Sequence, residues 1–104
     1  MDQNAVFDII RRFKQTLEAL NIQVDQLILF DSHADGTARE DSDIDLVVIS
    51  PSFSRMTYWE RIDVLSEAVC KVFAPIEPAA FTPEEWRSGE SILSDYAKSG
   101  ILVA

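Results

Sequence analysis

Residues 24–50 read VDQLILFDSHADGTAREDSDIDLVVIS and contain two short apolar runs rich in branched side chains. These runs, Val24 to Phe30 and Ile44 to Ile49, are typical of β-strands. The second run is apolar at nearly every position, which indicates a strand buried on both faces. The residues between the runs are small, polar and acidic and include Gly36, so they predict a loop around a short helical turn.

The sequence on either side of these strands shows helical periodicity. Apolar residues recur three or four positions apart over 3–20 and again over 55–73, which predicts two amphipathic helices. A third strand is predicted from Ile76 to Phe81. Pro78 favours an edge position for this strand, because proline has no N–H to donate. Further along, a helix start is predicted at Thr82-Pro83-Glu84-Glu85, a short helix at 91–98 and a closing strand at Ile101 to Val103.

Length and composition limit the class of protein. With 104 residues, 47% of them hydrophobic, the chain has room for one globular domain. We therefore expect a single α/β (α+β) domain over residues 1–104, with a small mixed sheet of three to four strands packed by helices. No apolar run is long enough to span a bilayer and no signal pattern opens the sequence, so a cytoplasmic protein is expected. The single cysteine, Cys70, follows Val69 and is predicted to be a small core residue.

Charge narrows the function further. Eighteen acidic residues oppose nine basic ones, which gives a net charge of −9. Such a chain is a poor generic binder of nucleic acid or of anionic lipid. Residues 31–45 are the most acidic stretch, and they form either a solvated loop or a site for cations; the acids there are Asp31, Asp35, Glu40, Asp41, Asp43 and Asp45 against Arg39 alone.

The strongest candidate site is the pair Asp43 and Asp45 at the start of the second strand. Residues two apart in a strand point to the same face, where two carboxylates repel unless a cation or a proton lies between them. Carboxylate oxygens favour Mg²⁺ or Mn²⁺. The alternative is a polar strand start in a solvated loop. A calcium-binding loop is excluded, because Leu46 and Ser52 stand where such a loop needs Gly and Glu.

A second candidate site lies upstream, directly after the first strand. Ser32 offers a hydroxyl at a strand-to-helix turn, where free backbone amides bind phosphate. Gly36 lets the backbone approach a ligand closely. An ordinary turn or cap serine is the alternative interpretation of Ser32. A nucleoside triphosphate with Mg²⁺ needs both kinds of site.

Together these residues resemble a known signature. FDSHADGTAREDSDIDLVVIS, residues 30–50, is similar to the signature of the minimal nucleotidyltransferase domains of the DNA polymerase beta-like superfamily: Gly-Ser, ten residues, then Asp-x-Asp. The resemblance continues to a third carboxylate at Glu77, ahead of Thr82-Pro83-Glu84-Glu85-Trp86. It covers roughly residues 24–104.

The resemblance implies the roles of the site residues. Asp43, Asp45 and Glu77 would hold Mg²⁺ or Mn²⁺, with Glu77 alternatively taking the proton of the acceptor or being a surface residue of an edge strand. The residues that would bind ATP or another nucleoside triphosphate are Ser32, Gly36 and Ser42.

The resemblance also implies an activity. The product would be a nucleoside monophosphate, AMP from ATP, attached to an acceptor hydroxyl. Minimal members of this family are commonly antitoxins of HEPN-type toxins, so a HEPN-type toxin is the implied protein partner. Self-association is a further possibility.

Two departures from the signature keep a second function open. Asp31 stands where the family has Gly, and Asp35 stands where a basic residue often precedes the second Gly. Both add negative charge beside a polyanion. The alternative is a catalytically degenerate binding module that neutralises a partner protein by contact. Among the other charged residues, Arg61 is predicted to lie on a solvated helix face; the aromatic residues Tyr58, Trp59 and Trp86 are interpreted as core or partner contacts.

Overall fold

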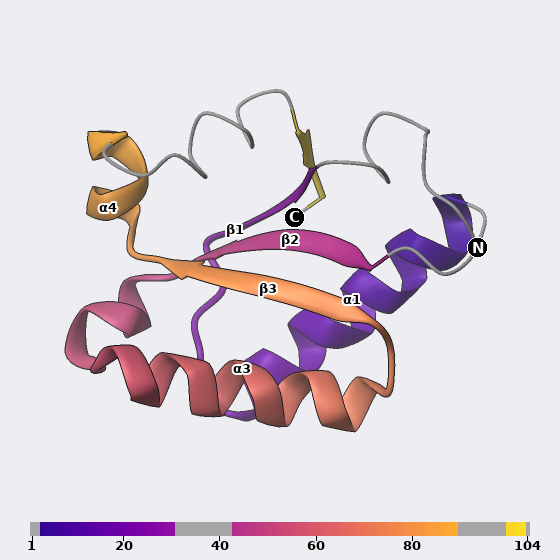
Figure 1. Cartoon of the computed structure of the whole chain (residues 1–104), viewed down its shortest axis with the longest axis horizontal. Coiled ribbons are helices and arrows are strands. Elements are labelled where there is room, and N and C mark those ends of the chain that lie inside the picture. The colour runs from indigo at the N-terminus through magenta and orange to yellow at the C-terminus, as the bar shows by residue number, and fades with distance from the viewer. Residues whose placement is uncertain (1–2, 31–42, 90–99, 104) are drawn as a thin grey trace.

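Strand β2 (Ile44–Ile49) lies inside a four-stranded sheet of order β3-β2-β1-β4 (Figure 1). The structure, a computed structural model, describes residues 3–30, 43–89 and 100–103. β1 (Gln26–Phe30) pairs antiparallel with β2 and with β4 (Ile101–Leu102), whereas β3 (Ile76–Phe81) runs parallel to β2. The mixed sheet and the edge position of β3 predicted from the sequence are confirmed.

Helices lie before β1, between β2 and β3, and between β3 and β4. α1 (Gln3–Ala19) precedes β1, and α3 (Tyr58–Val72) connects β2 to β3. A short 3-10 helix, η1 (Pro51–Arg55), follows β2, and α4 (Pro83–Ser88) follows β3. The helix predicted at 91–98 lies outside the described residues. None of the helices that the structure describes is both long and apolar enough to cross a membrane.

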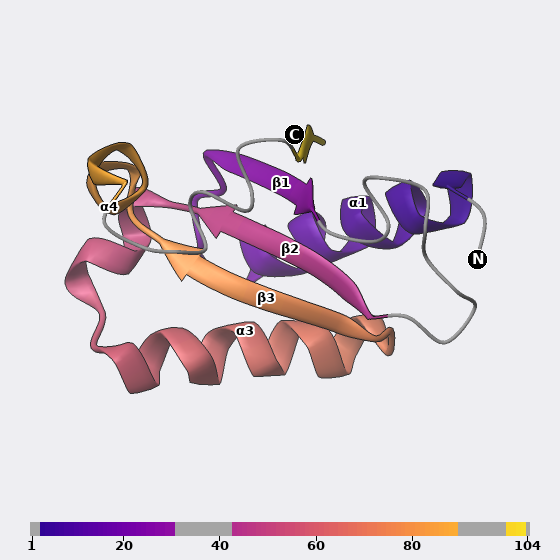
Figure 2. The same cartoon turned by 45° about the horizontal axis from the view of Figure 1, so that its top comes forward.

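The two long helices cover the same face of the sheet (Figures 1 and 2). Alternate residues of β2, namely Ile44, Leu46 and Val48, pack with them in the larger of two hydrophobic clusters. The intervening residues Val47 and Ile49 belong to a second cluster on the opposite face. β2 is therefore apolar on both faces, as its sequence predicts, and the smaller cluster also includes Ile28, Phe30, Phe81 and Trp86.

α3 begins later than its periodicity predicts. The predicted start was residue 55, whereas the helix begins at Tyr58 with Thr57 as its N-cap. The Thr57 hydroxyl accepts a hydrogen bond from the Glu60 N–H, and the Glu60 carboxylate accepts one from the Thr57 N–H. This reciprocal pair satisfies two amide groups that a helix start otherwise leaves unpaired. Pro51 instead begins η1, a separate turn capped by Ser50.

Pro78 shields the outer edge of β3. The amides of Ile44 and Ser50 donate to the carbonyls of Pro75 and Phe81, so the odd-numbered residues of β3 direct their backbone groups toward β2. Pro78 lies between them, where an N–H would point away from the sheet. Because proline has none, this edge offers fewer donors to a passing strand.

The C-terminal end of α3 generates a prediction of stability. Phe73 caps the helix in the left-handed conformation, with φ 57°, and its side chain is 94% exposed. A residue with a Cβ pays about 1 kcal/mol for that conformation, whereas glycine does not. We expect Phe73→Gly to raise the free energy of unfolding by roughly 0.5–1 kcal/mol in urea denaturation. Phe73→Ala, which keeps the backbone cost and removes the ring, should be nearly neutral; a glycine variant less stable than the alanine variant contradicts this explanation.

Candidate functional site

The face of the sheet that α1 and α3 leave uncovered carries the acidic residues predicted to form the site. Side chains alternate along a strand, and Ile44, Leu46 and Val48 point toward the helices. Asp45 therefore shares the other face with Val47 and Ile49. Its side chain is half-buried, which follows from its place in the interior of the sheet.

The strand register brings the second predicted carboxylate beside Asp45. Asp45 is the register partner of Glu77 on β3 and of Phe30 on β1. Residues paired in register share a face, so Glu77 projects on the same side as Asp45. Phe30 ends β1 and stands two positions before Ser32 in the sequence. The pairing thus brings Phe30, Asp45 and Glu77 side by side at one end of the sheet.

Asp43 extends this group toward solvent. It is exposed and directly precedes Ile44, whose amide donates to the Pro75 carbonyl at 2.7 Å. That hydrogen bond fixes the backbone at the point where β2 begins. Asp43 stands two positions before Asp45, so an extended chain there directs both side chains to the same face.

The three carboxylates differ from a finished metal site. Within the described ranges, no three Asp, Glu, His or Cys side chains come close enough together to hold a metal ion. The donor set nevertheless fits Mg²⁺ or Mn²⁺, because all three groups are carboxylates and two of them, Asp43 and Glu77, are exposed.

The residues predicted to bind phosphate lie outside the described residues. Ser32, Gly36 and Ser42 fall in the stretch 31–42, together with Asp31 and Asp35. Their roles, and the effect of the two acidic departures from the signature, stay predictions.

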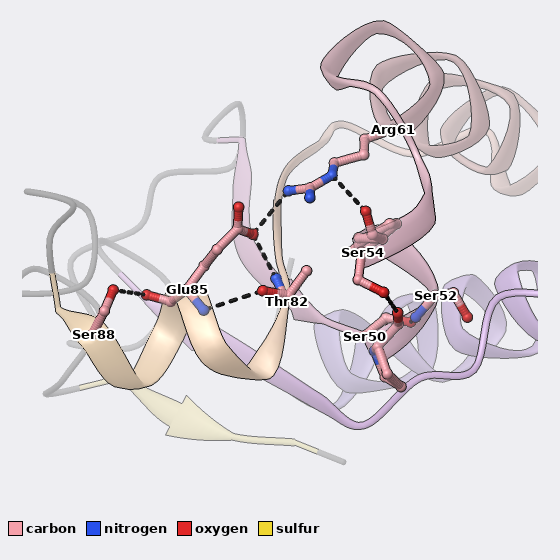
Figure 3. Close-up of polar contacts among 9 residues, drawn as sticks. Ser50, Ser52, Ser54, Arg61, Thr82, Glu85 and Ser88 are labelled. Carbon is pink, nitrogen blue, oxygen red and sulfur yellow. Dashed lines mark hydrogen bonds and ion pairs between the residues drawn. The ribbon is translucent and has the colours of Figure 1, made fainter.

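The turn after β3 has the helix start that its sequence predicts (Figure 3). The Thr82 hydroxyl accepts from the Glu85 N–H at 3.1 Å, and the Glu85 Oε1 accepts from the Thr82 N–H at 2.7 Å. Arg61 of α3 donates from Nη1 to the same Oε1 at 2.8 Å and from Nε to the Phe53 carbonyl at 3.1 Å. One guanidinium therefore joins η1, α3 and the start of α4.

This network shifts the titration of Glu85. Partial burial by itself raises the pKa of the carboxyl, but the hydrogen bonds from Thr82 and Arg61 and the charge of Arg61 outweigh it and lower the pKa below its ordinary value. In the other capping box, hydrogen bonds from Thr57 likewise lower the pKa of the Glu60 carboxyl. Both shifts belong to helix starts and lie apart from Asp43, Asp45 and Glu77.

Two predictions about single side chains are wrong. Arg61 is not on a solvated face, since only 17% of its side chain is exposed and its guanidinium lies 5.8 Å from the centre of the Phe53 ring. The signal was available, because Arg61 precedes the inward-facing Leu65 by one helical turn. Cys70 is exposed rather than buried, since Val69 and Val72 flank it in sequence but turn to other sides of the helix.

Comparison with known proteins agrees with this arrangement. The family described as nucleotidyltransferase domain matches residues 10–98, which confirms the resemblance found in the sequence. No curated protein matches the chain. A protein from Sulfolobus solfataricus, described as a candidate nucleotidyltransferase, has a similar crystal structure: TM-score 0.71 and 16% identity, over 96% of this chain and 80% of that one. A toxin-antitoxin structure with AMP-PNP has TM-score 0.62 and 18% identity, over 100% of this chain and 73% of that one.

The Glu85 network predicts a pH-dependent stability. Because the carboxyl pKa is lowered in the folded state, the ionised carboxylate stabilises the protein at pH values above its ordinary pKa of 4.5. This contribution is lost as the pH falls through the lower folded-state pKa. We expect the wild type to unfold at higher urea concentration than Glu85→Gln at pH 7, and the difference to shrink below about pH 4.5. Glu84→Gln is the control, because its ion pair with Arg87 is 3.8 Å long and exposed, and it should show little difference at any pH. A Glu85→Gln difference that grows toward low pH contradicts this linkage.

The register of Asp45 and Glu77 predicts a cost in stability. Like charges opposite each other on neighbouring strands destabilise a sheet by roughly 0.2–1 kcal/mol. In EDTA and low salt, Glu77→Gln is expected to raise the free energy of unfolding by an amount in that range, and added salt should reduce the gain. Glu67→Gln, which removes an exposed charge from α3, serves as the matched control. If Glu77→Gln lowers stability while the control does not, the two carboxylates do not oppose each other.

Proposed function

Because the chain belongs to the nucleotidyltransferase domain family, we propose that it is an Mg²⁺-dependent nucleotidyltransferase that transfers AMP from ATP to an acceptor hydroxyl. The observation that carries the proposal is the register of Asp45 with Glu77, with Asp43 two residues before Asp45 on the same strand. Carboxylates aligned on one sheet face at one end of the strands reduce the stability of the fold. Such carboxylates bind the divalent cations that accompany a triphosphate.

Each predicted site residue has a role in this proposal. Asp43, Asp45 and Glu77 hold the divalent cation, and Ser32, Gly36 and Ser42 contact the phosphates. A divalent cation held by these carboxylates would supply positive charge against the triphosphate and Lewis-acid polarisation of the reacting phosphorus. The chain itself orients the nucleotide and provides fixed charges around the reacting group, which is the main source of catalysis in phosphoryl chemistry.

The reaction is an in-line displacement at the α-phosphorus. The acceptor oxygen forms a new bond to that phosphorus, and the bond from the phosphorus to the oxygen bridging the α- and β-phosphates breaks. Pyrophosphate leaves with the electron pair of that bond. The proton of the hydroxyl passes to a carboxylate, for which Glu77 on the exposed edge strand is the candidate when it does not complete the cation site.

The structural likeness to a toxin-antitoxin protein solved with AMP-PNP supports two finer parts of the proposal. The first is an adenine nucleotide as donor. The second is a protein partner, for which we propose a HEPN-type toxin that carries the acceptor hydroxyl. The net charge of −9 suits a partner with a basic surface.

A second candidate function has its own support in the sequence. Asp31 and Asp35 replace a glycine and a basic position of the signature. Beside a polyanion each added charge weakens binding, by about 4 kcal/mol at 4 Å and an effective dielectric constant near 20. A chain weakened in this way would neutralise its partner by contact alone.

The decisive experiment is calorimetric titration with α,β-methylene ATP, whose modified bridge this reaction cannot break. We expect binding by the wild type with Mg²⁺ and much weaker binding in EDTA. Asp43→Asn should lose the Mg²⁺-dependent part, a loss of at least about tenfold in affinity, because it removes a carboxylate ligand. It should keep the unfolding free energy of the wild type within about 1 kcal/mol, since Asp43 is exposed.

Asp63→Asn is the matched control for this titration. It removes the same charge from an exposed position on α3, in the other layer of the fold, and should bind the nucleotide as the wild type does. A folded wild type with no Mg²⁺-dependent binding overturns the transferase proposal and favours the binding module.

A further inference from the structure

A row of exposed side chains runs along α3 on the side away from the sheet. Its members recur four and three positions apart, so they lie on one face of the helix. We call this row the α3 stripe; it consists of Trp59, Asp63, Ser66, Cys70 and Phe73, all of them exposed. From its first to its last residue it extends roughly 21 Å at about 1.5 Å per residue.

Both ends of the α3 stripe are aromatic. Trp59 is 71% exposed and packs edge-to-face against Tyr58, itself 68% exposed, with ring centroids 5.1 Å apart. Phe73 is almost fully exposed, in a backbone conformation that favours glycine. These rings do not contribute to the core, because they are exposed, and the left-handed backbone at Phe73 disfavours a side chain there. Exposed aromatic side chains of this kind are enriched at the centres of protein interfaces.

A pocket adjoins the aromatic pair. It measures about 290 Å³ and lies between α3 and the edge strand β3, which run side by side (Figures 1 and 2). Tyr58 lines one side of it and Pro78 the other, and the remaining lining is mainly apolar, with Ile62, Leu65 and Phe81 among it. An apolar side chain from outside can enter there and remain in contact with Tyr58.

The centre of the α3 stripe is acidic. Asp63 lies on it and Glu67 lies next to it, and both side chains are exposed. Within the part of the chain that the structure describes, neither carboxylate makes an ion pair. The surface is therefore aromatic at its ends and negative between them. Its electrostatic complement is apolar at the ends and positive between.

We propose that the α3 stripe, with Tyr58 and the adjoining pocket, docks a basic amphipathic helix of a partner protein. Apolar side chains of that helix cover Trp59 and Phe73, and its lysines or arginines face Asp63 and Glu67. A second copy of this chain fits the surface less well, because it brings the same carboxylates against each other in a protein of net charge −9. Nucleic acid is disfavoured for the same reason.

The inference rests on the proposed function only in requiring a protein partner. α3 packs on the face of the sheet opposite to Asp45 and Glu77, so a partner helix held by the α3 stripe leaves these carboxylates uncovered. Docking and nucleotide binding can therefore fail separately. Asp43→Asn should leave docking unchanged, and changes on the α3 stripe should leave nucleotide binding unchanged.

The test uses the full chain and two synthetic 18-residue helical peptides. One carries leucines at both ends of a face with lysines between them, and the other has glutamates in place of the lysines. We expect calorimetry to detect binding of the lysine peptide only. Binding should also shift the fluorescence of Trp59 to shorter wavelength in Trp86→Phe protein, where Trp59 is the sole tryptophan.

Matched double variants separate docking from net charge. Asp63→Lys with Glu67→Lys should weaken the lysine peptide at least about tenfold. Glu18→Lys with Asp25→Lys makes the same change in net charge at exposed positions of other segments and should weaken it no more than about threefold. Trp59→Ala should weaken it by about tenfold or more.

Several outcomes overturn the proposal. They are no binding of the lysine peptide, equal loss in the two double variants, and unchanged affinity in Trp59→Ala. Self-association that Trp59→Ala abolishes, measured by sedimentation, assigns the surface to a second copy instead and likewise overturns it. Loss of Mg²⁺-dependent nucleotide binding in Asp43→Asn bears on the proposed function alone.

Discussion

The structure depends on the burial of β2 on both of its faces. Every residue of this strand except Asp45 is buried, and alternate side chains enter two separate hydrophobic clusters. Each such side chain contributes about 1.5–3 kcal/mol when it leaves water. A shift of β2 by one residue would exchange the two sets and place Asp45 under the helices. The register of β2 with its neighbours is therefore strongly fixed.

The fixed register of β2 also fixes the positions of the acidic residues. Asp45 lies between Phe30 on β1 and Glu77 on β3, and the hydrogen bond from Ile44 to Pro75 holds the strand start that carries Asp43. The same packing that stabilises the sheet thus keeps two carboxylates on neighbouring strands in register. A core that gains many kcal/mol tolerates a local repulsion of at most about 1 kcal/mol. A pair of carboxylates can therefore be kept at this position for a function, because the sheet is stable despite the repulsion between them.

The sequence predicts the elements better than it predicts the directions of side chains. The bounds of β2, the capping box at Thr82 and the edge position of β3 follow from local chemistry, namely apolar runs, helix caps and a proline. The predictions for Arg61 and Cys70 were wrong, because they followed from residue type and from neighbours in sequence, whereas burial on a helix follows the positions three and four residues away, such as Leu65 for Arg61. Asp43 and Asp45 were identified from their spacing at a strand start, and Glu77 from the family resemblance. The alignment of Asp45 with Glu77 comes from the parallel pairing of two strands that α3 separates in the sequence. The predicted phosphate contacts stay predictions, since their residues lie outside the described part of the chain.

The acidic residues of the chain interact with other charges at two different distances, one long and one short. Outward-facing charges such as those on α3 are separated from Asp45 and Glu77 by a layer of the fold, on the order of 10 Å. At that separation a unit charge in water contributes about 0.4 kcal/mol before screening, and the Debye length of about 8 Å at physiological salt reduces it further. A carboxylate about 4 Å from a bound cation interacts with it about ten times more strongly at an effective dielectric constant of about 20. In the proposed function, the local arrangement of Asp43, Asp45 and Glu77 therefore sets the affinity for a cation and a nucleotide, whereas the net charge of −9 favours the approach of basic partner surfaces. By the same estimate, the field of the proposed basic helix on α3 is too weak to change the proposed nucleotide binding at the sheet face. A partner would influence that site only by direct contact with it or by a change in the packing of β2 and β3.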